Sequence, residues 1–103
     1  MDLEERSGFE RALVRAAATD SSARQILKQR LSEHVEQATR EFMRLRQIPE
    51  TRTRELLNVG MAPFDSVFKR YLKAGRIEDA EEGHFYSYYM WWMRQALVTY
   101  LAG

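Results

Sequence analysis

The segment from Ser22 to Arg46 constrains the fold most, because it contains neither proline nor glycine and its apolar residues recur at helical spacing. Apolar positions three or four residues apart share one face of an α-helix. The segment therefore predicts one long amphipathic helix that must bury this face against other elements. The positions expected on the face are Ile26, Leu27, Leu31, Val35, Ala38, Phe42 and Leu45.

Both ends of this helix carry boundary signals. Residues 19–22, Thr-Asp-Ser-Ser, supply side chains that commonly cap the first turn of a helix. Ile48 precedes Pro49, and the residue before a proline is pushed out of the helical region. The helix is therefore expected to begin near residue 22 and to end near residue 46.

Three further stretches have helical spacing: residues 9–16, 50–72 and 84–101. Gly60 and Pro63 predict a kink or a break inside the second of them. With two prolines and five glycines, the chain has little material for a turn-rich sheet. The residues expected to meet in the core are Phe42, Leu57, Phe68, Met93 and Leu97.

We therefore expect an all-α fold, a compact bundle of four to five helices. Residues 1–103 are expected to form a single helical domain, in which residues 1–29 are an N-terminal helical extension. An acidic connector, residues 73–83, separates the last two helical stretches.

Composition excludes several classes of protein. The chain has no cysteine, which rules out disulfides and thiolate metal sites. It has no apolar run long enough to cross a bilayer, and its first six residues are polar and acidic, unlike a signal peptide. A cytoplasmic protein without a membrane partner is expected. The net charge is +1, so any attraction to nucleic acid must come from a local group of cations.

The sequence contains no recognisable catalytic pattern. It has no nucleophile paired with a base and no glycine-rich phosphate loop, and His34 and His84 have no partner at metal-ligand spacing. We expect a protein that is not an enzyme and that holds no metal and no cofactor.

The last helical stretch has two unlike faces. One is apolar and is expected to lie in the core: Tyr86, Tyr89, Met90, Met93, Ala96, Leu97, Tyr100 and Leu101. The other mixes Tyr88, Trp91, Trp92 and Val98 with Arg94 and Gln95, and Phe85 lies at the border. Aromatic rings interleaved with arginine and glutamine suit unstacked bases. An aromatic stripe at helical spacing is, however, more often part of a core.

Residues 85–97 resemble region 2 of bacterial sigma factors, since Tyr88-x-x-Trp91-Trp92-x-Arg94-Gln95-Ala96 matches the strongest signature of that family. A weaker match covers residues 55–60, Glu-Leu-Leu-Asn-Val-Gly, and continues to Tyr71. Together the resemblance spans about residues 30–101, region 2 alone.

The resemblance implies a transcription initiation module with two binding surfaces. Glu55, Asn58 and Gly60 would face the β′ clamp helices of the RNA polymerase core. The other surface would bind promoter DNA at the −10 element as a single strand, with a polar pair beside aromatic rings that capture a flipped base. Its residues are Phe85, Tyr88, Trp91, Trp92, Arg94 and Gln95.

Departures from the family pattern keep two alternatives open. Val98 replaces a base-reading threonine, Tyr89 replaces a small core alanine, and the connector is acidic. The first alternative is a sigma-mimicking module that binds an anti-sigma factor or another regulator without binding DNA. The second is a helical oligomerisation or adaptor domain.

Overall fold

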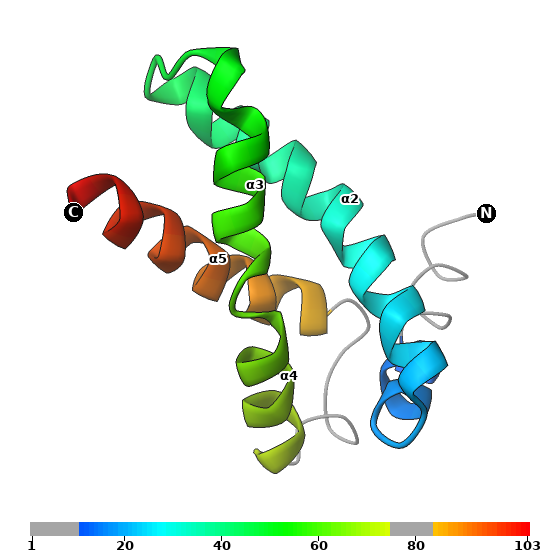
Figure 1. Ribbon diagram of the computed structural model, residues 1–103. Coiled ribbons are helices and arrows are strands. Elements are labelled where there is room, and N and C mark those ends of the chain that lie inside the picture. Colours follow the sequence, from blue (N-terminus) through cyan, green and yellow to red (C-terminus); the bar gives the residue numbers. More distant parts are fainter. Residues whose placement is uncertain (1–10, 75–83) are drawn as a thin grey trace.

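Residues 11–74 and 84–103 are described by a computed structural model, and all regular secondary structure in these ranges is helical. Figure 1 shows the helices crossing one another as a small bundle, so the expected all-α fold is confirmed. Residues 11–17 form a short helix ahead of the others, within the expected N-terminal extension. The remaining elements are α2 (Ser21–Leu45), the short 3-10 helix η1 (Glu50–Arg52), α3 (Thr53–Met61), α4 (Phe64–Lys73) and α5 (His84–Ala102).

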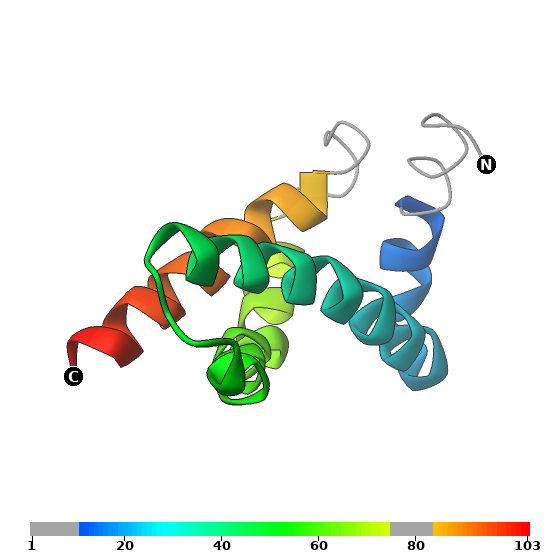
Figure 2. The same ribbon diagram turned by 90° about the horizontal axis from the view of Figure 1, so that it is seen from above.

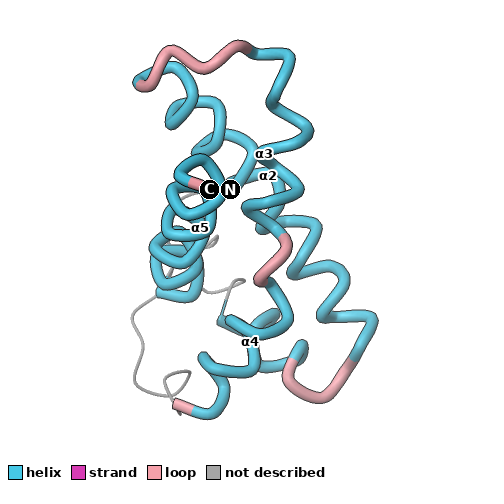
Figure 3. Tube along the Cα trace, turned by 60° about the vertical axis from the view of Figure 1, so that its left-hand side comes forward, coloured by secondary structure: helices cyan, strands magenta, loops and turns pink. Residues whose placement is uncertain are grey.

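Helix α2 begins and ends at well-formed caps. The Asp20 carboxylate accepts hydrogen bonds from the amides of Ser22 (2.9 Å) and Ala23 (3.4 Å), which confirms a cap within residues 19–22. At the other end Gln47 has a φ of 57°. The amide of Ile48 then donates to the Met43 carbonyl at 2.9 Å, and the Gln47 amide donates to Arg44 at 3.3 Å. This pair of bonds is a Schellman motif, and Figure 3 shows the loop that follows it.

The buried residues of α2 recur every four positions rather than every three or four: Ala23, Leu27, Leu31, Val35, Thr39 and Met43. Four residues turn a helix by slightly more than one revolution, so this row drifts by roughly 40° at each step. The N-terminal half of α2 contacts residues 11–17 and α4, where Arg24 lies over the Phe68 ring and Lys28 over the Phe64 ring, and its C-terminal half contacts α3 and α5. Contacts of Arg24 with the Ala17 carbonyl and of Thr39 with Met93 mark the two halves.

Because of this drift, part of the apolar face expected from the sequence is not buried. Leu45 is 69% exposed and Ile26 is 47% exposed, although both were placed in the core. Ala38 and Phe42 are only partly buried. The row reaches Thr39 and Met43 instead, because near its C-terminal end α2 packs against α3 and α5 rather than against the elements that cover its start.

The second helical stretch is broken rather than kinked. Helix α3 ends at Met61 and α4 begins at Phe64, and Pro63 lies between them. The helix is interrupted here because proline has no amide hydrogen to donate to the helical hydrogen bonds. Just before the break, the Gly60 carbonyl accepts a 2.7 Å hydrogen bond from the buried Tyr89 hydroxyl of α5. This bond fastens α5 to the end of α3, and Figure 1 shows α5 beginning beside the junction of α3 and α4.

An aromatic cluster from α4 and α5 fills the centre of the core. It consists of Phe64, Phe68, Tyr71, Phe85 and Tyr89, which are at most 2% exposed. Of the residues expected to meet in the core, Phe68, Met93 and Leu97 are buried there, whereas Phe42 and Leu57 are partly buried at its edge.

Candidate nucleic-acid interface

Three rings of α5 gather on one side of the helix, and we call Tyr88, Trp91 and Trp92 the aromatic face. Trp91 is 58% exposed, whereas Tyr88 and Trp92 are half-buried. The Trp91 and Trp92 rings are perpendicular, with centroids 5.0 Å apart, and Tyr88 lies 6.4 Å from Trp92. Tyr88 in turn packs against Tyr71 of the core at 5.1 Å. The face is therefore anchored at one edge and open to solvent at the other.

Arg70 of α4 adds a positive charge to the aromatic face. Its guanidinium carbon lies 4.7 Å from the centroid of the Trp92 ring, in cation–π geometry. Sequence reasoning missed this residue, because the contact joins two helices and leaves no local spacing signal. A basic residue in the last turn of α4, just before the core ring of Tyr71, was the only available indication.

Arg94 and Gln95 are both exposed, but they lie on different sides of α5. Gln95 follows Trp91 by four residues and Trp92 by three, so it stands over the same side of the helix. Arg94 instead borders a hollow between α5 and α2, which is also lined by Phe42 and Arg46. The structure thus separates the pair that the sequence placed together.

Phe85 requires a correction. It was expected at the border of the apolar sector and was assigned to DNA, but it is 2% exposed. Its ring centroid lies 5.0 Å from that of Tyr71 and 5.8 Å from that of Phe68. A ring enclosed in this way has no free side for a base, so we assign Phe85 to the core.

Glu55, expected to face the polymerase, is already engaged within the chain. Its carboxylate accepts hydrogen bonds from Arg52 Nε (3.1 Å) and Nη2 (2.9 Å), and also from the Tyr100 hydroxyl. The bonds from Arg52 and then that from Tyr100 lower the pKa of Glu55 to about 2. Tyr100 was expected in the core but is 44% exposed, because α5 has by then passed the buried centre of the bundle.

Asn58 is exposed on α3, whereas Gly60 is buried, which corrects the third expected polymerase contact. A Cβ atom at Gly60 would lie 3.0 Å from Met93 Cγ and 3.2 Å from Val35 Cγ1. Gly60 therefore lets three helices approach closely and presents no side chain to a partner.

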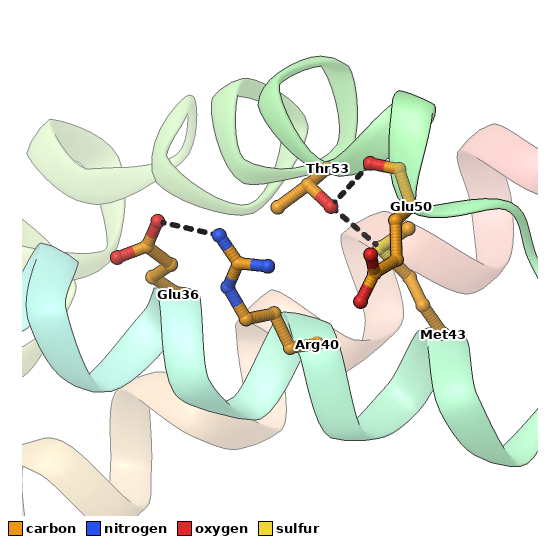
Figure 4. Close-up of polar contacts among 5 residues, drawn as sticks. All are labelled: Glu36, Arg40, Met43, Glu50 and Thr53. Atoms are coloured by element: carbon orange, nitrogen blue, oxygen red, sulfur yellow. Dashed lines mark hydrogen bonds and ion pairs between the residues drawn. The ribbon is translucent and has the colours of Figure 1, made fainter.

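A polar seam joins the end of α2 to the start of α3. Thr53 Oγ1 donates a 2.7 Å hydrogen bond to the Glu50 carbonyl and lies 3.8 Å from Met43 Sδ (Figure 4). Arg40 pairs with Glu36 at 3.4 Å on the exposed side of α2. Of these contacts, the one between Thr53 and Met43 joins the start of α3 to the end of α2, whereas the pair of Arg40 and Glu36 lies within α2.

The remaining expectations concern metal binding, the membrane and the acidic connector. Within residues 11–74 and 84–103, no three His, Asp or Glu side chains gather where they could hold a metal ion. None of the helices in that part of the chain has the length and hydropathy needed to cross a bilayer. The connector residues Glu78, Asp79, Glu81 and Glu82 lie outside the described residues.

A scan against protein-family models and searches of curated proteins and of solved structures found no match to this chain.

Proposed function

We propose that this chain is a non-enzymatic transcription module that binds single-stranded DNA at a −10-like element through the aromatic face. The observation that carries the proposal is Trp91, an indole that is 58% exposed beside a second indole which already holds a guanidinium. The resemblance of residues 85–97 to sigma region 2 gives the class of ligand. Such a module would act in the cytoplasm, where polymerase and promoter meet.

Stacking on unpaired bases is the chemistry that suits this surface. Every base has a flat π surface, and an exposed ring that is fixed at its inner edge offers a stacking partner without further ordering. The Trp91 ring is open to solvent, and its perpendicular contact with Trp92 limits its freedom to rotate. A paired duplex hides these base surfaces, so the rings favour a melted strand.

Two polar groups beside the rings would complete the site. The Arg70 guanidinium, 4.7 Å from Trp92, supplies positive charge for a backbone phosphate. The Gln95 amide can both donate and accept hydrogen bonds at a base edge. Arg94, on the side of α5 that borders α2, would meet a phosphate farther along the strand.

The second part of the proposal concerns the polymerase. Asn58 is exposed on α3 and Glu55 is partly exposed one turn earlier, so both can reach a partner on that side of the bundle. We assign this surface to the β′ clamp helices. Because Glu55 is already bonded to Arg52 and Tyr100, a partner must compete with contacts inside the chain, and binding is expected to be weaker than in a full sigma factor.

A titration of the full chain with a dye-labelled −10-like single strand tests the DNA proposal. Stacking contributes roughly 1–3 kcal/mol per base, so Trp91→Ala is expected to weaken binding about 5- to 150-fold. Ile26→Ala removes an exposed apolar side chain near the start of α2 and is expected to leave the affinity unchanged. A scrambled strand tests selectivity, and repetition at several salt concentrations reports phosphate contacts. No binding at low salt would overturn the DNA proposal.

The polymerase assignment is tested separately by pull-down with the isolated clamp coiled coil. Asn58→Ala is expected to weaken capture, and Ile26→Ala again serves as the control. Failure of the intact chain to bind at roughly tens of micromolar would overturn this part alone.

A protein-binding module is the second candidate, and the exposure of Val98 favours it. Val98 is 38% exposed on α5, where the family has a base-reading polar residue. Together with Trp91 it offers apolar area to a regulator such as an anti-sigma factor, or to a second copy of the chain. Loss of the DNA signal together with self-association through Trp91 in light scattering would favour this candidate.

A further inference from the structure

A groove separates α2 from α5 on the side of α5 away from the aromatic face. Two adjoining hollows of about 580 Å³ and 430 Å³ form it, and they share Ala38, Glu41 and Met90. We call it the α2–α5 groove, and in the view of Figure 2 α5 passes across α2. One end lies at His34, and the other reaches Leu45.

The Leu45 end of the groove is apolar and open to solvent. Leu45 is 69% exposed, the most exposed large apolar residue of the described chain. Beside it lie the partly buried Phe42 and Met90. Methionine side chains adapt their shape to a partner, which is why they are frequent on binding surfaces. Nothing within residues 11–74 and 84–103 covers Leu45.

The charges around this end are predominantly positive. The Arg46 guanidinium lies 4.4 Å from the centroid of the Phe42 ring, which positions it at the mouth of the groove. Arg94 lines the opposite wall. The one carboxylate on the lining, Glu41, accepts two hydrogen bonds from Arg44, at 2.5 Å and 3.2 Å, so its charge is compensated.

We infer that the α2–α5 groove docks an acidic amphipathic helix of a partner protein. Apolar side chains of the helix would cover Leu45, Phe42 and Met90, and carboxylates would pair with Arg46 and Arg94. Charge complementarity at the rim selects an acidic partner and fixes its direction in the groove. This inference concerns a surface other than the aromatic face. It shares Arg94 with the DNA proposal, but its test at Leu45 does not depend on that proposal.

The shape and chemistry of the groove favour a helix over a nucleic-acid strand. From His34 to Leu45, α2 advances about 16 Å, which matches roughly three turns of a docked helix. Helices commonly bind such grooves through anchors at positions i, i+3 or i+4, and i+7. A base would need an open ring to stack on, and the Phe42 ring already lies beneath Arg46.

The test uses the full chain and a designed, dye-labelled helical peptide of about 14 residues. Its leucines are spaced at i, i+4 and i+7 and are flanked by glutamates; a second peptide replaces every glutamate with lysine. Anisotropy is expected to show tighter binding of the acidic peptide. Leu45→Glu should weaken this binding by roughly tenfold or more, because it removes an apolar contact and adds a like charge. The NMR signal of the Met90 methyl group should shift on binding.

Ile26→Glu is the matched control, since it places the same charge on another exposed apolar position of α2, outside the groove. It is expected to leave peptide affinity unchanged, and thermal unfolding checks that both variants fold. The double variant Arg46→Glu/Arg94→Glu should reverse the preference toward the lysine peptide. Equal affinity for both peptides, or no effect of Leu45→Glu, would overturn the inference. So would a Leu45-dependent affinity for an oligo-dT strand that exceeds the affinity for the acidic peptide.

Discussion

The substitution Tyr89→Phe deletes a single oxygen atom and thereby removes the hydrogen bond between Tyr89 and Gly60. Tyr89 is fully buried, and its hydroxyl donates to the Gly60 carbonyl at 2.7 Å. The substitution keeps the ring, which packs against Phe64 and Phe85, and removes only the donor. The Gly60 carbonyl is then left beside a phenyl ring at the break between α3 and α4, without the hydroxyl that donates to it.

The expected loss follows from the cost of an unpaired buried carbonyl. A buried acceptor left unsatisfied costs about 1–3 kcal/mol, so Tyr89→Phe should lower the free energy of unfolding by that amount. In a domain of this size each kcal/mol corresponds to roughly 4–8 °C in melting temperature. Urea unfolding followed by circular dichroism at 222 nm measures both the free energy and its m-value. The m-value is expected to stay unchanged.

Tyr100→Phe is the matched control, since it removes the hydroxyl of an exposed tyrosine that donates to Glu55. Its effect should be clearly smaller, because water can replace the lost bond. If both variants lose the same stability, the hydroxyl of Tyr89 does not hold α5 to α3.

The same residue makes a prediction about alkaline pH. Burial, and secondarily the charge of Asp65, raises the pKa of Tyr89 above its ordinary value of 10. Folding therefore favours the protonated phenol, so this contribution is fully present below pH 10 and is lost as the pH rises through the folded pKa. Tyr89→Phe has no such group, and its stability is expected to fall less steeply above pH 10 than that of the original chain. Parallel slopes would contradict this reasoning.

Three further predictions can be tested with the same methods. Leu97→Ala, at a fully buried position, should lose roughly 2–5 kcal/mol in urea unfolding, and a loss under about 1 kcal/mol would contradict its place in the core. Gln47→Gly should raise the free energy of unfolding by about 1 kcal/mol, since glycine adopts the positive φ of 57° without strain; a lower stability would argue against the Schellman cap. If DNA binds the aromatic face, neutralising the connector should tighten binding of the −10-like strand in the anisotropy titration, because like-charge repulsion is removed. The residues to neutralise are Glu78, Asp79, Glu81 and Glu82.

The local parts of the fold were predictable from the sequence, because their causes are local. The cap at Asp20 and the interruption at Pro63 act on neighbouring backbone, so spacing and residue type were sufficient to find them. Which side of a helix is buried depends instead on what crosses it. In the C-terminal half of α2, Thr39 is fully buried and Ala38 only partly buried for this reason, although threonine is the more polar residue.

The candidate site was predictable to a similar extent. The exposure of Trp91 follows from its position on α5, opposite the buried residues Tyr89 and Met93. The placement of Phe85 in the core and of Arg70 over Trp92 depends on α4, which the spacing within the last helix could not reveal. Gly60 has no side chain to indicate a role, and only the approach of Met93 shows why a larger residue would not fit.

The buried residues of α2 recur every four positions, and this spacing makes the helix more sensitive to insertions and deletions than to substitutions of single residues. One residue inserted between Leu31 and Val35 would rotate everything beyond it by roughly 100°. Thr39 and Met43 would then turn away from α3 and α5, while the start of α2 kept its contacts with residues 11–17. Four inserted residues would return the buried side chains beyond them to within roughly 40° of their original direction. They would, however, move α3 about 6 Å along the axis of α2. Deletions and insertions in α2 should therefore be far less tolerated than substitutions at its exposed positions.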